Sequence, residues 1–204
     1  DAQRTMNTFL GAAQLLEKSS IDMAAVADSG IIYLEGYLWD PAQPRAAMEA
    51  AHAAGRKVAF TLSDTFCVDR HRDGFWQLLR DGKIDILFAN EAEAASMVQV
   101  NDIEEAIPAL SAYAQTLAVT RSESGATAVR NGQRVDVPAE PIARLVDTTG
   151  AGDLFAAGFL AGEARGLGLE ASLRLGAIAA AEVIQHYGAR PEQDLKALAE
   201  NLLG

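Results

Sequence analysis

Cysteine is nearly absent from this chain of 204 residues, which contains Cys67 and no other. A single cysteine excludes an internal disulfide, and with no signal peptide at the start it predicts a cytoplasmic protein. No apolar run is long enough to span a membrane. Basic residues are also scarce: the chain has 17 Lys and Arg but 28 Asp and Glu, and the formal net charge is −11. Without a basic block, no nucleic-acid or anionic-membrane partner is expected.

Motifs of other nucleotide-binding classes are missing too. No Gly-x-x-x-x-Gly-Lys-Ser/Thr stretch occurs, which excludes a Walker-type NTPase. The glycine spacing at 166–171 matches a dinucleotide fingerprint, but it follows a predicted helix rather than a strand. We interpret it as a turn between two helices. The His-Arg-Asp tripeptide at 71–73 matches protein kinases, but no Asp-Phe-Gly accompanies it, so we interpret it as helix surface.

About half of the residues are apolar, which is enough for one sizeable core, and we expect residues 1–204 to form a single domain. Compact apolar runs alternate with segments of helical periodicity. These runs are predicted to be buried strands at 30–36, 57–62, 85–89 and 116–120. This alternation predicts an α/β fold in which a mostly parallel sheet has helices on both faces. Two short strands around Asn131-Gly132 predict a hairpin with a tight turn.

The segment 147–155 has the sequence Asp-Thr-Thr-Gly-Ala-Gly-Asp-Leu-Phe and opens a predicted helix. Its glycines allow the backbone to turn tightly and to approach a ligand closely. Free amides of Gly150, Ala151 and Gly152 at the helix start would bind an anion, aided by the helix dipole. Asp153 follows directly, where a carboxylate can accept the proton of an attacking hydroxyl during phosphoryl transfer. The alternative is an ordinary glycine-containing loop in which Asp153 only complements the dipole.

This stretch resembles the C-terminal signature of the ribokinase (PfkB) family of sugar and nucleoside kinases, and the resemblance extends over essentially the whole chain. It implies a ribokinase-like fold and transfer of the γ-phosphoryl group of ATP to a primary hydroxyl of a sugar or ribonucleoside. The implied base is Asp153, the anion hole is formed by 150–152, and the cofactors are ATP and Mg²⁺. The alternatives are a non-catalytic nucleotide-binding regulatory module of the same fold and, more distantly, a Rossmann-type dehydrogenase.

The second motif is Asn90-Glu91-Ala92-Glu93, directly after a predicted strand. As a structural device, Asn90 caps a helix and Glu93 completes a capping box. The resemblance implies that the same two residues order Mg²⁺ and the phosphates, usually through water. Because Mg²⁺ takes few protein carboxylates, one Glu is enough. The two interpretations are compatible, since a cap fixes the carboxylate in place.

The turn after the strand at 116–120 is implied to hold the ATP phosphates. Thr120 and Gly125 match the family pattern, whereas Ser122 lies where many sugar kinases have Gly. The alternative is a polar turn that leads into the hairpin.

The Ala-rich helix predicted at 169–187 is implied to face the adenine ring. Ala177 and Ala181 would contact the ring, and ordinary helix packing is the alternative. Many family members have Asn where Gly176 falls, so one polar contact with adenine is missing here.

A monovalent cation such as K⁺ is also implied. Asp147, Thr149 and Gly188 would contribute to its site through the carboxylate and carbonyl oxygens. Glu192 departs from the family here, because Ser or a similar residue is usual at its position.

The N-terminal segment carries Arg4, which in the adenosine-kinase-like branch lies near the transferred phosphate and can clamp its oxygens bidentately. The alternative is a surface residue. The loop 63–68 also resembles adenosine kinases, and together these favour a nucleoside substrate over a sugar. Family members are considerably longer at this end, so we expect an N-terminal portion and a lid to be absent from this chain. That lid would grip the small-molecule substrate and mediate a homodimer.

The motifs at Ser63, Asn90, Thr120 and Asp147 each follow a predicted strand. Open α/β folds bind ligands at the carboxyl edge of the sheet, where such strand ends meet. The sequence therefore predicts that these motifs lie together at that edge.

Overall fold

A computed structural model describes residues 9, 11–15, 17–39 and 43–203, and Arg4 lies outside this range. The strands are Ile31–Glu35 (β1), Lys57–Thr61 (β2), Ile86–Asn90 (β3), Thr116–Thr120 (β4), Ala126–Arg130 (β5) and Gln133–Val137 (β6). The α-helices are Met23–Asp28 (α1), Gln43–Ala53 (α2), Thr65–Arg80 (α3), Glu91–Val98 (α4), Ile103–Ser111 (α5), Ala151–Ala164 (α6), Leu169–Val183 (α7), Leu195–Leu198 (α8) and Glu200–Leu203 (α9). Short 3₁₀ turns include Gly36–Leu38 (η3) and Ser122–Ser124 (η4).

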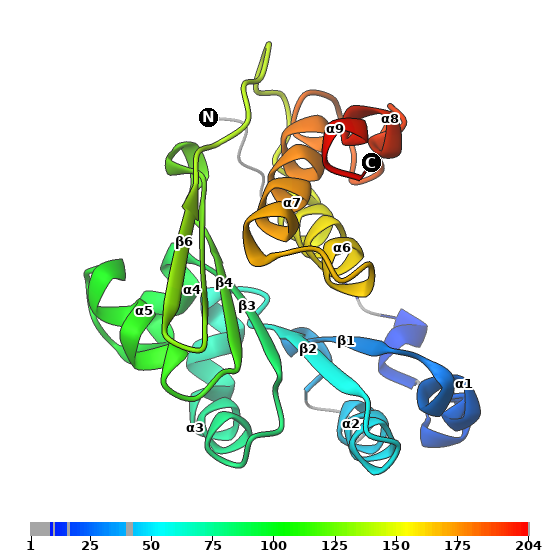
Figure 1. The fold of residues 1–204 in the computed structure, drawn as a ribbon. Coiled ribbons are helices and arrows are strands. Elements are labelled where there is room, and N and C mark those ends of the chain that lie inside the picture. The colour runs from blue at the N-terminus through cyan, green and yellow to red at the C-terminus, as the bar shows by residue number, and fades with distance from the viewer. Residues whose placement is uncertain (1–8, 10, 16, 40–42, 204) are drawn as a thin grey trace. The chain divides into compact units, whose positions relative to one another are not determined.

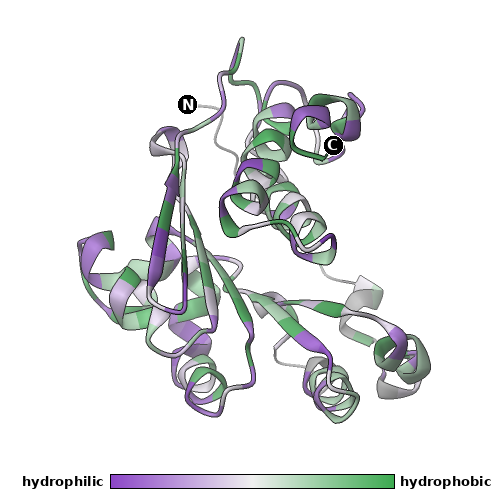
Figure 2. Cartoon of the chain, viewed as in Figure 1, coloured by the Kyte–Doolittle hydropathy of each residue, from purple (hydrophilic) through white to green (hydrophobic). Residues whose placement is uncertain are grey.

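The strands form a sheet in the order β1-β2-β3-β4-β5-β6, so neighbours in the chain are neighbours in the sheet (Figure 1). β1 pairs with β2 and β2 with β3 in parallel, and Phe60 of β2 lies between Leu34 and Leu87. The predicted α/β fold is confirmed. β3 and β4 are mostly hydrophobic, whereas the exposed strand β6 is mostly hydrophilic (Figure 2).

The described residues group into two compact units. The strand-rich unit comprises residues 9–119 and 129–133, and the C-terminal unit comprises 120–128 and 134–203. In the part of the chain that is described, no helix has the length and apolarity needed to cross a membrane.

An aromatic cluster anchors the core of the strand-rich unit. The rings of Phe60 and Phe75 meet edge to face with centroids 5.2 Å apart, and Trp39 contacts both at 6.0 Å. Such pairs add about 0.5–1.5 kcal/mol beyond the burial of their area. They fix β2 against α3, and so fix the loop at 62–64 between them.

The predicted Asn-Gly hairpin is present between β5 and β6. Asn131 and Gly132 have φ of 53° and 76°, the left-handed values that a tight two-residue turn requires. In contrast, the segment before Asp147 is not a strand as predicted: residues 138–150 are described and form none. The amides of Val146 and Asp147 instead donate to the carbonyl of Ile184, at 2.8 and 3.4 Å. The position of Asp147 is therefore set by the C-cap residue of α7.

Glycines allow α6 and α7 to pack closely side by side in the C-terminal unit (Figure 1). A Cβ atom on Gly158 would lie 2.4 Å from the carbonyl oxygen of Leu175, and one on Gly176 would lie 2.8 Å from that of Phe155. Backbone cannot move away as a flexible side chain can. Gly176 thus has a role in helix packing.

We expect Gly158→Ala to destabilise the protein. Overpacking costs about 1–3 kcal/mol, which exceeds the gain of up to about 1 kcal/mol from better helix propensity. Gly152→Ala on the same helix is the matched control, because a Cβ there meets nothing within 4 Å. Thermal unfolding should show a lower midpoint for Gly158→Ala and an equal or higher midpoint for Gly152→Ala. Equal midpoints for both variants would contradict this account of the packing.

Candidate active site

The first turn of α6 presents backbone amides to solvent. Gly150 caps the helix in the left-handed conformation, with φ of 80°, and its carbonyl accepts from Leu154 at 2.9 Å. The amide of Ala151 donates to the carbonyl of Thr148 at 3.3 Å. Among the described residues, the amides of Gly152 and Asp153 have no acceptor. The amide of Gly150 has none there either, so two of the three predicted donors, Gly150 and Gly152, are open, and the amide of Asp153 joins them.

The Asp153 carboxylate lies on the exposed side of this turn. It has no hydrogen-bond or ion-pair partner within the described part of the chain. Gly152 beside it is also exposed and faces open space. An unpartnered carboxylate next to unpaired amides leaves room for both an anion and a hydroxyl group.

The three predicted cation ligands are brought together beside this turn. Asp147 Oδ1 accepts from the amide of Thr149 at 2.9 Å and from its hydroxyl at 2.5 Å, while Oδ2 accepts from the amide of Gly188 at 3.1 Å. A Cβ on Gly150 would lie 2.7 Å from the Cβ of Ala189. The loop after α7 thus lies directly against the start of α6, which only a glycine at 150 permits.

The turn with Thr120 is shaped by its own backbone. The amide of Arg121 donates to the carbonyl oxygen of Gly125 at 2.8 Å. A Cβ on Gly125 would lie 2.0 Å from the carbonyl oxygen of Val137, so this glycine has a packing role within the unit. Ser122 has φ of 48°, in the left-handed region, which explains why glycine suits this position.

The two predicted adenine contacts differ in their surroundings. Ala181 lines a cavity of about 280 Å³ in the C-terminal unit, together with Pro141, Ile178 and Gln185. Ala177 is buried and does not line it. One helical face of α7 therefore contributes to this cavity, and Ala177 lies beside that face.

The predicted capping box is confirmed in the strand-rich unit. Asn90 ends β3, its side chain accepts from the amide of Glu93 at 2.8 Å, and Glu93 Oε2 accepts from the amide of Asn90 at 3.0 Å. Glu93 is 5% exposed. Burial raises its pKa from about 4.5 to about 7, the backbone hydrogen bond from Asn90 opposes the shift, and the charge of Asp64 adds to it.

Asp64 and Tyr37 are residues of this site that the sequence reasoning missed. Asp64 caps α3 by accepting from the amide of Cys67 at 2.6 Å, and its other oxygen accepts from the Tyr37 hydroxyl at 2.8 Å. Burial and this hydrogen bond raise the pKa of Tyr37, with added repulsion from Asp64 and Glu93. The signal in the sequence was the Asp at the start of a helix after β2, directly beside the flagged Ser63.

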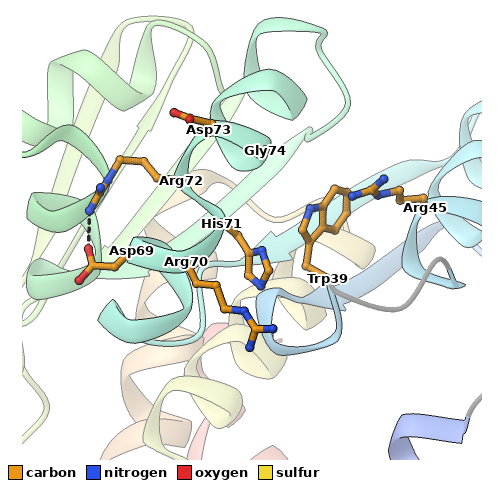
Figure 3. A pocket seen from close by; sticks show the side chains of 8 residues that line it. All are labelled: Trp39, Arg45, Asp69, Arg70, His71, Arg72, Asp73 and Gly74. Carbon is orange, nitrogen blue, oxygen red and sulfur yellow. Dashed lines mark hydrogen bonds and ion pairs between the residues drawn. The ribbon is translucent and has the colours of Figure 1, made fainter.

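A second cavity, of about 330 Å³, contains none of the predicted site residues (Figure 3). It is lined by Trp39, Arg45 and residues 69–74 of α3, and the guanidinium of Arg45 stacks 4.6 Å above the Trp39 ring. Arg72 pairs with Asp69 at one side of it. Across all described residues, no group of three or more His, Cys, Asp or Glu side chains could hold a metal ion. A metal ion bound to the described chain would therefore need further oxygen ligands, from water or from a bound substrate.

Comparison with known proteins decides the family. A family model described as pfkB family carbohydrate kinase matches residues 1–195. The chain belongs to this family. A similar PfkB chain is the cytidine kinase of Thermococcus kodakarensis, 37% identical over 141 residues, which cover 66% of this chain and 49% of that protein. The match to this family model confirms the resemblance that the sequence motifs indicated.

Solved structures of several kinases share the fold. A probable sugar kinase from Rhizobium etli has a TM-score of 0.95 and 46% identity over 98% of this chain and 62% of its own. An adenosine kinase from Sinorhizobium meliloti has a TM-score of 0.88 and 44% identity, over 92% and 59%. A putative ribokinase II from E. coli, in complex with ATP and Mg²⁺, matches the fold at 20% identity and a TM-score of 0.80. This chain spans 49% to 62% of the length of the first three.

The raised pKa of Glu93 predicts a pH-dependent stability. A carboxyl group whose pKa is higher in the folded state contributes stability that is complete below pH 4.5 and is lost as the pH rises through 7. The shift corresponds to about 3 kcal/mol. We expect Glu93→Gln, which has no charge to bury, to lose less unfolding free energy than wild type between about pH 5 and about pH 8.

Urea unfolding without divalent metal measures this difference. Glu105→Gln, an exposed change on α5, serves as control and should leave the pH dependence of wild type in place. The assignment to Glu93 would be wrong if wild type and Glu93→Gln lost the same free energy over this pH range.

Proposed function

We propose that this PfkB protein transfers the γ-phosphoryl group of ATP to a primary hydroxyl of a small sugar or ribonucleoside. The observation that carries the proposal is the start of α6, where the amides of Gly152 and Asp153 lack acceptors and the Asp153 carboxylate lacks a partner. Amides at a helix start stabilise the negative charge of a transferring phosphoryl group. Asp153 accepts the proton of the attacking hydroxyl.

We propose Mg²⁺ as the metal ion that Asn90 and Glu93 order. Glu93 is buried with a pKa near 7 and lies close enough to Asp64 to be repelled by it, so a divalent cation would relieve an unfavourable concentration of charge. Mg²⁺ keeps several waters and needs few carboxylates. When bound with ATP it neutralises phosphate charge. Asn90 and Glu93 would hold its water ligands through the fixed geometry of the capping box.

ATP would be held by the C-terminal unit. Thr120, Ser122 and Gly125 would contact its phosphates, and Ala181 with the cavity beside it would receive the adenine ring. Asp147 already orients Thr149 and Gly188 around one carboxylate, which supports a monovalent cation such as K⁺ there. Its role would be to hold the loop against α6.

A ribonucleoside is the preferred substrate class. It is supported by the similarity to a cytidine kinase and to an adenosine kinase, while the similarity to a probable sugar kinase keeps sugars on the test panel. Phosphorylation of adenosine, cytidine, ribose and fructose by the full-length gene product would test the class. Binding of Mg²⁺-ATP with no transfer to any acceptor would favour a regulatory nucleotide-binding module. Dimer formation and a cytoplasmic location stay predictions from the sequence.

Asp153→Asn tests the base. The amide has the same shape but does not accept the proton, so kcat should fall about 10²- to 10⁴-fold. The dissociation constant of Mg²⁺-ATP, measured by calorimetry, should change little. Asp73→Asn, an exposed change on α3, is the control and should keep wild-type kcat. Turnover at the wild-type rate in Asp153→Asn would rule out the assignment.

Gly152→Ala tests whether a ligand approaches the backbone at the start of α6. No protein atom lies within 4 Å of the added Cβ, so folding should be unaffected. A phosphoryl group held by the neighbouring amides would contact it, and kcat/KM should fall about tenfold or more, since small misplacements are costly in catalysis. A stable variant with unchanged kcat/KM would show that the phosphate binds elsewhere.

A further inference from the structure

Glu182 is a buried charged residue that the sequence motifs do not use, and it is one of the residues that line the cavity beside Ala181. It lies in the last turn of α7 and is 2% exposed. A carboxylate at this end of a helix is disfavoured by the dipole, and its burial adds a desolvation cost. Such a placement needs compensating interactions.

The compensation comes from the loop that follows α7. Glu182 Oε1 accepts from the amides of Glu192 and Gln193 at 2.9 and 3.0 Å, and from His186 Nε2 at 3.2 Å. These donors satisfy an oxygen that burial has removed from water. Oε2 is buried and has no partner among the described residues. One oxygen thus ties both the near and the far side of the loop to the helix.

The same loop forms the support of the α6 start. Between the residues tied to Glu182 lie Gly188, whose amide donates to Asp147 at 3.1 Å, and Ala189, which packs on Gly150. Gly150 is the cap from which the free amides follow. A continuous set of contacts therefore runs from Glu182 through the loop to the amides beside Asp153, all within the C-terminal unit.

We propose that Glu182 is a positioning residue, whose carboxylate oxygen holds the loop 188–193 against the start of α6 and so sets the geometry of the phosphoryl-binding amides. The inference rests on the proposed kinase activity. It makes no use of the charge on Glu182 as such, because the amides of Glu192 and Gln193 need an oxygen acceptor at the right reach. The alternative is a role that depends on the charge of Glu182, through its contact with His186 Nε2 at 3.2 Å.

Two variants separate these roles. Glu182→Gln keeps an oxygen acceptor at the same reach and removes the charge. Glu182→Asp keeps the charge but is one methylene shorter and withdraws from the loop amides. Glu170→Gln, an exposed change in the first turn of the same helix, is the control.

We expect Glu182→Asp in the full-length gene product to lower kcat about 10- to 100-fold, because displacement of catalytic groups by about 1 Å has this effect. The dissociation constant of Mg²⁺-ATP, measured alongside, separates this effect from weaker binding of adenine in the cavity that Glu182 also lines. Glu182→Gln and Glu170→Gln should retain kcat within about threefold of wild type. The reverse order, with Glu182→Gln impaired and Glu182→Asp active, would overturn the proposal in favour of the ion pair. Equal activity of all variants would overturn it as well.

Amide hydrogen exchange gives a readout that does not need activity. In Glu182→Asp, the amides of Gly188, Glu192 and Gln193 should exchange faster than in wild type. In Glu182→Gln, the same amides should exchange at the wild-type rate. If wild type phosphorylates no acceptor, the proposed function fails, and exchange alone decides whether Glu182 holds the loop. If wild type is active but exchange at Gly188 is unchanged in Glu182→Asp, the positioning inference fails and the proposed function stands.

Discussion

Unpaired backbone amides at the first turn of α6 are the constraint on which the C-terminal unit depends. Every helix start leaves amides without partners, and most are satisfied by a capping side chain. Here the cap is Gly150, which has no side chain, and the amides of Gly152 and Asp153 stay open. Their acceptor comes from solvent or from a bound ligand. The surrounding contacts of Asp147 and Ala189 keep this turn in place without filling it.

In the strand-rich unit, by contrast, the start of α4 is capped by side chains, one of which is the carboxylate that we propose to order Mg²⁺. Asn90 and Glu93 satisfy two amides reciprocally, which holds the carboxylate in one orientation. Burial beside Asp64 makes that carboxylate favour a proton near neutral pH. A divalent cation would take the place of the proton. The group is thus positioned by a local rule, and its pKa is set by its tertiary surroundings.

Local rules explain which features were predictable from the sequence. The capping box of Glu93 and the Asn131-Gly132 turn each depend on residues within four positions, and both are confirmed. The contacts that were missed join distant segments: Tyr37 reaches Asp64 across 27 positions, and Glu182 binds amides ten and eleven positions later. The strand predicted before Asp147 was wrong for the same reason, since its apolar side chains gave no indication that its amides pair with Ile184.

Three glycines at the start of α6 and within it are explained by three different physical reasons. Gly150 is required by a left-handed φ and by contact with Ala189, whereas Gly158 is required by the backbone of α7. Gly152 has neither reason, because its surroundings are open and its conformation is ordinary. A helix gains stability from Ala at such a position. No contact within the described chain requires a glycine there, and the close approach of an anion to the adjacent amides is the reason that the proposed function supplies.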